Sequence, residues 1–240
     1  MIKSIVLLIL IPALVPVFAV LFFVYSKDRF AREPFKQVAK IFLISAIVAP
    51  ISIPLERIAM AIFYTNYKPS SIFDLDFKDN LLCVALVEEG VKWLVLMILA
   101  WNKKVFKYRY DGIVYAVVTS LGFAASENIM YIYYLGSGVA LSRAIFSIPG
   151  HAMFGVFMGF FVSRARQGAN KGHIITPFFS LILSIAVPVL LHGIYDFLLS
   201  DSIRYGGYGL LFFIFVFVSD VLAWMAMYND FASDRPLGKK

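Results

Sequence analysis

The chain has 240 residues, of which 61% are hydrophobic and only 15% are charged. A soluble domain usually carries about 25% charged residues, so this composition excludes an ordinary soluble protein and indicates one that lies in a membrane. The formal net charge of +7 could suggest a nucleic-acid partner. The basic residues, however, stand in short loops between apolar runs, where they set membrane orientation instead. We therefore expect a lipid-embedded protein that does not bind nucleic acid.

Seven apolar runs are long enough to cross a bilayer, which needs about 20 helical residues. In chain order they are Ser4 to Tyr25, Val38 to Tyr64, Leu81 to Trp101, Ile113 to Leu135, Ala140 to Val162, Ile174 to Leu199 and Tyr208 to Tyr228. The short connections leave no room for a separate soluble domain. The sequence therefore predicts an all-α polytopic membrane bundle of about seven helices, with a single domain over residues 1–240.

The basic residues alternate from loop to loop. They are frequent in segments 26–37, 102–110 and 163–173 and in the C-terminal tail, and sparse in the other connections. Cytoplasmic loops carry the excess of Lys and Arg. With seven spans, this pattern places the N-terminus outside and the C-terminus in the cytoplasm.

The third run contains Glu88, Glu89 and Lys92 near its middle. On a helix Lys92 lies four residues after Glu88 and three after Glu89, so it can pair with either acid. A salt bridge that only neutralises the segment leaves one acid without a partner, which is costly in lipid. Two adjacent carboxylates with one lysine are also a means of dividing acid and base roles at a catalytic site.

Three further runs carry polar side chains: Glu127 with Asn128, then His151, then His192 with Asp196. His192 and Asp196 are four residues apart, so they can hydrogen-bond on one helix face. Asn128, or either histidine alone, could instead serve as an interhelical hydrogen-bonding group. At 1.5 Å per residue, Glu127, the two histidines and the acids of the third run lie roughly 11–16 Å below the outer ends of their spans. The common depth predicts one site in the outer half of the membrane.

The chain lacks the signatures of serine, aspartyl and ordinary zinc proteases, and also P-loop and dinucleotide fingerprints. A glutamate can hold a water as general base while imidazole donors stabilise an oxyanion. Alternatively, a divalent metal such as zinc can carry the water, with Glu127, His151 and His192 as candidate ligands. The sequence leaves the cofactor open between these two chemistries. Glu56 and Arg57 in the second run are either a structural pair or part of a substrate-lining surface.

Two functions outside hydrolysis use similar features. A proton- or ion-coupled transporter would also need buried Glu, His and Lys, but it would predict paired broken helices, which the sequence does not show. A noncatalytic membrane scaffold could bind single-span helices through the glycine faces of the bundle.

Four short motifs occur in order on four of the runs: Glu88-Glu89-Gly-Val-Lys92, Phe123-Ala-Ala-Ser-Glu127-Asn128, His151 before a glycine-rich helix, and His192-Gly-Ile-Tyr-Asp196. Together they resemble the PrsW family of bacterial intramembrane proteases, in a wider clan with CAAX-type prenyl endopeptidases and bacteriocin-processing enzymes. Segment 27–34, Lys-Asp-Arg-Phe-Ala-Arg-Glu-Pro, resembles the first loop of that family. The resemblance runs from about residue 20 to 200.

The resemblance implies an intramembrane endopeptidase of the bacterial cell (inner) membrane that cuts a membrane-anchored protein. A candidate reaction is the first, outer-side (site-1) cut of a single-pass anti-sigma factor, a signal-transduction step. A CAAX-type protease acting on prenylated proteins would instead need a site on the cytoplasmic side, which the depth argues against.

The resemblance also assigns Glu88 and Glu89 as essential paired acids with Lys92 as their partner, and the site is completed by Glu127, His151 and His192, supported by Asn128 and Asp196. We expect Glu88 or Glu89 to act as the base and His192, steadied by Asp196, to donate to the oxyanion. His151 is expected to be a second ligand of the water. Glu127 stands where the wider clan more often has histidine, which keeps the metal question open.

Overall fold

The structure is a computed structural model that describes residues 6–27, 33–68, 70–102, 104, 106–205, 207–232 and 236–238. Every regular element in these residues is helical, which confirms the predicted all-α fold. In chain order they are η1 (Val6–Leu10), α2 (Ile11–Ser26), α3 (Phe35–Val48), η2 (Ala49–Ile51), α4 (Ser52–Asn66), α5 (Ile72–Lys78), η3 (Asp79–Ala85), α6 (Leu86–Leu96), η4 (Met97–Trp101), α7 (Arg109–Leu135), η5 (Ser137–Val139), α8 (Ala140–Ser142), η6 (Arg143–Ser147), α9 (Ile148–Asn170), α10 (Ile175–Tyr205) and α11 (Gly209–Ala232).

Six helices of the described chain are long and apolar enough to cross a membrane, whereas the sequence predicted about seven spans. The six are Leu7–Ser26, Phe35–Thr65, Arg109–Leu135, Ser137–Asn170, Ile175–Ser200 and Gly209–Ala232. The difference is the predicted span 81–101, which is helical throughout as the end of η3, α6 and η4. Its centre carries Glu88, Glu89 and Lys92, and these charges take it outside the composition of an ordinary spanning helix.

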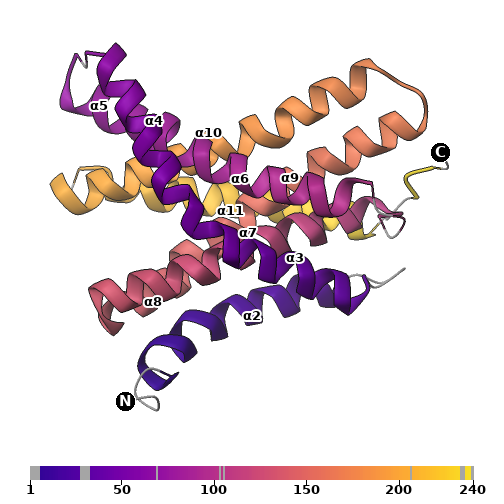
Figure 1. The fold of residues 1–240 in the computed structure, drawn as a ribbon, viewed down its shortest axis with the longest axis horizontal. Helices are drawn as coiled ribbons and strands as arrows, with labels where there is room; N and C mark the ends of the chain where they lie inside the picture. The colour runs from indigo at the N-terminus through magenta and orange to yellow at the C-terminus, as the bar shows by residue number, and fades with distance from the viewer. Residues whose placement is uncertain are drawn as a thin grey trace.

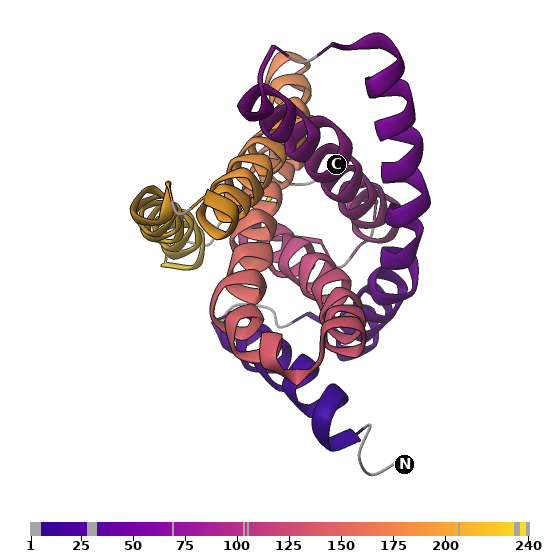
Figure 2. The same cartoon turned by 90° about the vertical axis from the view of Figure 1, so that its left-hand side faces the viewer.

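The bundle is arranged around α7, most of which is buried, while few residues of α2 and α11 are buried. Figure 1 shows α7 and α9 in the middle of the bundle, with α2 along one edge and the α3–α4 segment crossing in front. In the end-on view of Figure 2, α11 lies on one side and the α3–α4 segment on the opposite side. The helices that carry the predicted site therefore form the inner part of the bundle.

Helix α6 has its polar face inside and its apolar face outside. Glu88, Glu89 and Lys92 are at most 6% exposed, whereas Leu86 and Leu94 are 44% and 53% exposed. This inversion of the usual soluble pattern is expected for a helix in lipid, because charged groups there must be enclosed by protein while leucine is at no disadvantage outside.

Glycines allow α9 to approach α7 closely. A Cβ on Gly155 would lie 2.9 Å from the Val117 Cα, and one on Gly159 would lie 2.7 Å from the carbonyl carbon of Gly112. Both distances are too short for real carbon contacts, so only glycine fits. These glycines, four and eight residues after His151, therefore form a close-packing face that brings the start of α9 against the centre of α7.

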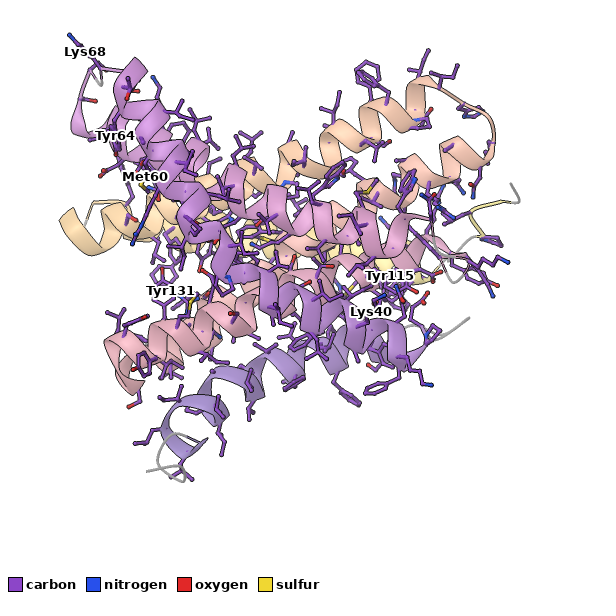
Figure 3. The ribbon with its side chains drawn as sticks, viewed as in Figure 1. Lys40, Met60, Tyr64, Lys68, Tyr115 and Tyr131 are labelled. Atoms are coloured by element: carbon purple, nitrogen blue, oxygen red, sulfur yellow. The ribbon has the colours of Figure 1, made fainter. Side chains whose placement is uncertain are left out.

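The two ends of the bundle differ in the residues that they present. Figure 3 places Tyr64 and Lys68 at one end, with Tyr131 on the same side of the molecule, and Lys40 and Tyr115 toward the other. The orientation with the N-terminus outside stays a prediction. Residues 28–32 of the predicted first loop, and several basic residues of the predicted cytoplasmic segments, lie outside the described residues.

We expect Gly159→Ala to destabilise the protein by about 1–3 kcal/mol, because the added methyl group must push α7 and α9 apart. The matched control is Gly90→Ala in α6, where a Cβ meets nothing within 4 Å. That change should be neutral or stabilising by about 0.5–1 kcal/mol, since alanine loses less backbone entropy in a helix. Thermal unfolding in lipid nanodiscs measures both, and equal melting temperatures for the two variants would contradict the close packing.

Candidate active site

Four helices bring all of the predicted catalytic side chains into one buried cluster. They are Glu88, Glu89 and Lys92 on α6, Glu127 on α7, His151 on α9, and His192 with Asp196 on α10. The predicted supporting residue Asn128 joins the cluster through Arg143. The catalytic roles of these residues stay proposals, whereas their contacts are features of the structure.

The ammonium group of Lys92 stands at the centre of the cluster. Its Nζ lies 2.7 Å from Glu89 Oε1, 3.2 Å from Glu88 Oε2 and 3.1 Å from His151 Nδ1. The Lys92 side chain has no exposed surface, and the Phe123 ring lies beneath Nζ at 4.4 Å. An ammonium group has three protons, so these three neighbours use its full donor capacity.

The contact with Lys92 determines the tautomer of His151. Because an ammonium group has no acceptor, His151 Nδ1 must accept. The ring proton of the neutral imidazole then lies on Nε2, which donates to Glu127 Oε2 at 2.7 Å. Polar contacts therefore run without a break from α6 through α9 to α7.

His192 lies between two carboxylates. Its Nδ1 is 2.9 Å from Glu89 Oε1 and its Nε2 is 3.1 Å from Asp196 Oδ2, so the predicted contact between His192 and Asp196 is confirmed. The ring of Phe154 stacks on the imidazole with centroids 4.8 Å apart. Two carboxylates and one stacked aromatic ring therefore leave the His192 ring a single orientation.

A cavity of about 700 Å³ opens beside the cluster. Glu88, Glu127, His151, His192 and Asp196 line it, whereas Glu89 and Lys92 do not. The two adjacent glutamates thus differ in access to the cavity. A molecule in the cavity contacts Glu88, whereas Glu89 does not line the cavity and instead binds Lys92 and His192.

Three cavity residues were not predicted as site residues from the sequence, apart from the open interpretation of Glu56. Glu56 lines the cavity, which agrees with the substrate-lining interpretation, whereas its neighbour Arg57 is exposed and does not line it. Tyr195 lies between His192 and Asp196 in the sequence and also lines the cavity. Arg143 was considered in the sequence only among the basic residues that set membrane orientation. In the structure it contacts Glu127 and Asn128. The sequence feature that could have identified Arg143 is the presence of an arginine within a predicted apolar run.

The donor atoms of the cluster fit a divalent metal. Two sets of three ligand atoms lie within 4.8 Å of one another: Glu88, Glu89 and His192, and Glu88, Glu127 and His151. Imidazole nitrogen and carboxylate oxygen are ordinary zinc ligands. The second set lines the cavity, and His151 Nε2 points away from Lys92 toward Glu127. It is therefore the set better placed for a metal.

The charge balance of the cluster also suits a divalent cation. Glu88, Glu89, Glu127 and Asp196 carry four negative charges when ionised, and Lys92 and Arg143 carry two positive ones. Of the remaining two negative charges, one is neutralised when His192 carries a proton on both ring nitrogens, which face Glu89 and Asp196. The other is unfavourable in a low-dielectric interior unless a cation or a proton neutralises it.

Comparison with known protein families shows which family the chain belongs to. The family described as "PrsW family intramembrane metalloprotease" matches residues 33–222, a stretch that contains every member of the cluster. The chain belongs to the PrsW family. It is therefore an intramembrane peptidase, with multiple spans in the bacterial inner membrane, and the transporter and scaffold interpretations give way to a protease.

Curated PrsW relatives cover most of the chain. Protease PrsW of Clostridioides difficile strain 630 is 36% identical over 198 residues, which cover 80% of this chain and 79% of the relative. Protease PrsW of Oceanobacillus iheyensis is 35% identical over 193 residues, covering 80% and 82%. Protease PrsW of Bacillus subtilis strain 168 is 36% identical over 203 residues, covering 84% and 87%. No solved structure matches the chain.

We expect Lys92→Met to destabilise this PrsW protein by about 3–5 kcal/mol, because it leaves two buried carboxylates without their cation. Adding Glu89→Gln to Lys92→Met should recover part of that loss, since it removes one of the stranded charges. The free energy of unfolding of both variants in lipid nanodiscs measures this. A Lys92→Met variant as stable as the wild type would show that the buried ammonium does not hold the cluster together.

Proposed function

We propose that the chain hydrolyses a peptide bond in a membrane-anchored protein near the outer side of the bilayer, with a water activated by Glu88. A single-pass anti-sigma factor is the candidate substrate, and the reaction would be its site-1 cut. One membrane-embedded domain, residues 1–240, would carry the whole reaction. The observation that supports this most is the cavity that exposes Glu88 while Glu89, directly behind it, anchors Lys92 and His192.

In this proposal Glu88 is the general base. It lies within hydrogen-bonding distance of one cation, Lys92, and faces the cavity, so a water there can give it a proton. As the water oxygen bonds to the carbonyl carbon, Glu88 takes that proton, and it later passes the proton to the leaving amine when the C–N bond breaks. Glu89 accepts from both Lys92 and His192 and would keep their positions through the reaction.

His192 would donate to the developing oxyanion from Nε2. This nitrogen faces Asp196, which lines the cavity, whereas Nδ1 faces Glu89, which does not. The Nε2 side is therefore the one that a substrate carbonyl can approach. A pre-oriented donor in a low-dielectric site stabilises negative charge without reorganisation, which is the main advantage of an oxyanion hole.

A divalent metal, if the protein uses one, would be held by Glu88, Glu127 and His151. When bound, it would supply Lewis acidity toward the water and the carbonyl oxygen. A metal held by Nε2 would take the place of the proton that Nε2 donates to Glu127. Without a metal, Glu127 fixes the His151 ring through Nε2, and Lys92 fixes it through Nδ1. This keeps the His151 side of the cavity rigid around the reacting atoms.

The shape of the cavity favours a cut in the outer half of the membrane. Beyond the cluster its lining continues to Tyr131, Tyr134 and Leu135 at the end of α7 and to Val139 in η5. Tyr134 is 76% exposed and Leu135 is 63% exposed, and tyrosine is enriched at the membrane–water interface. A substrate segment can therefore enter from the predicted outer interface. A CAAX-type reaction would instead require entry from the cytoplasm.

We expect Glu88→Gln and Glu89→Gln each to lower cleavage of a single-pass anti-sigma factor at least 100-fold, because loss of general-base catalysis typically costs a factor of 10²–10⁴. The Glu89 variant acts indirectly, by releasing Lys92 and His192. The matched control is Glu33→Gln: this buried glutamate accepts from Tyr115 and does not line the cavity, so its variant should retain cleavage. Immunoblotting of substrate in co-expressing cells measures the three. Full cleavage by both site variants would contradict the proposed site.

Metal dependence is testable without a substrate. We expect wild-type protein purified without chelator to retain about one equivalent of divalent metal, and His151→Ala and Glu127→Gln to lose most of it, because each removes a ligand atom. Elemental analysis by mass spectrometry measures the content, with His173→Ala, an exposed histidine in the turn after α9, as the control. Cleavage by metal-free wild-type protein in chelator would instead favour a water held by glutamate alone.

A further inference from the structure

Among the described residues, Arg143 is the one lysine or arginine that lines the cavity, and the mechanism above does not use it. It begins η6, a π-helical turn just before α9. Its Nε donates to Asn128 Oδ1 at 2.6 Å, its Nη2 lies 3.6 Å from Glu127 Oε2, and its guanidinium carbon stands 3.9 Å from the centre of the Tyr131 ring. All three partners lie close together on α7, so Arg143 packs against the face of that helix that carries Glu127.

Asn128, which binds Arg143, is itself held in place by α2. Asn128 is 1% exposed, and its Nδ2 donates to the Ala13 carbonyl of α2 at 3.4 Å. Its Oδ1 therefore points toward Arg143, and the Tyr131 ring lies against the guanidinium group, 3.9 Å from ring centre to guanidinium carbon. The Arg143 side chain is only 15% exposed, which protects these contacts from water. The orientation of Arg143 is thus set by α2 and α7 together.

The same carboxylate oxygen of Glu127 faces both Arg143 and His151. Oε2 is 2.7 Å from His151 Nε2 and 3.6 Å from Arg143 Nη2. In the part of the chain that the structure describes, Arg143 is the only lysine or arginine within ion-pair distance of Glu127. Without it, the carboxylate would face the imidazole with no cation beside it, in a region where an unpaired charge is costly.

We propose that Arg143 is a positioning residue that keeps the Glu127 carboxylate turned toward His151 Nε2 and thereby keeps the His151 ring in its reactive orientation. This inference rests on the proposed function of Glu127 and His151. Arginine suits the task because its planar fork reaches Asn128 through Nε and Glu127 through Nη2 while its face stacks on Tyr131. Lysine has one point charge and cannot make all three contacts.

Kinetics test the role of Arg143 against a purely structural one. With a single-span substrate in nanodiscs, Arg143→Gln should lower kcat about 10- to 100-fold and leave KM within about threefold, as expected when the ion pair with Glu127 and the hydrogen bond to Asn128 are lost. Arg143→Lys retains the charge and should give an intermediate kcat with wild-type stability. The control is Arg57→Gln, an exposed arginine on α4, which should behave as wild type. A change in KM alone would make Arg143 a substrate contact and overturn the proposal.

The state of His151 gives a readout that does not depend on cleavage. The chain has only three histidines, so ¹⁵N-histidine labelling yields a spectrum in which His151→Ala and His192→Ala assign the signals. Arg143→Gln should shift the His151 Nε2 signal in the same direction as Glu127→Gln does, and the double variant should add no further shift, because both changes remove the same contact. Arg57→Gln should leave the spectrum unchanged.

The outcomes separate this inference from the proposed function. If Glu127→Gln and His151→Ala still cleave the substrate, the proposed site is wrong, whatever Arg143 does. If both are inactive but Arg143→Gln has wild-type kcat and wild-type His151 signals, the site stands and the positioning role of Arg143 is refuted.

Discussion

A lysine ammonium enclosed in protein at membrane depth is the constraint on which the rest of this structure depends. The cost of burying a charge in a low-dielectric interior is recovered only when hydrogen-bond acceptors surround it. Lys92 meets that demand with two carboxylates from its own helix and one imidazole from α9. Because the third acceptor comes from another helix, satisfying the charge also fixes the rotation of α6 relative to α9. The charge thereby arranges the other ionisable groups of the cluster around itself.

Close helix packing allows this charge network to extend to α7. Gly155 and Gly159 let the backbone of α9 approach that of α7, so His151, one turn before Gly155, can reach Glu127. With larger residues at these glycines the helices would stand farther apart, and the contact between His151 Nε2 and Glu127 would have to be bridged by water or be lost. In lipid, where apolar burial does not drive helices together, such packing and the interhelical hydrogen bonds supply the association energy.

The cavity divides the roles of two neighbouring acids. Glu88 and Glu89 differ by 100° around α6, and this is enough to place Glu88 at the cavity wall and Glu89 behind it. A protease within a membrane needs water at one reactive group and dry, rigid support around it. In the proposed mechanism the same helical turn supplies both, because one acid faces the cavity and the other contacts Lys92 and His192. The pair is therefore asymmetric in its surroundings even though its two residues are identical.

Contacts within one helix followed from the sequence, because helical geometry alone sets them: Lys92 with its two acids, and His192 with Asp196. The all-α fold followed from apolar runs, although the charges of the third run take it out of the ordinary spanning composition. Contacts between helices did not follow. The sequence placed Glu127, His151 and His192 at one depth. Only packing decided that His192 faces Glu89 and that His151 joins Lys92 to Glu127. Packing also decided that Arg143 contacts α7. The reason is physical: spacing along a helix determines which residues share a face, whereas the partner that this face meets depends on the rotation and approach of every neighbouring helix.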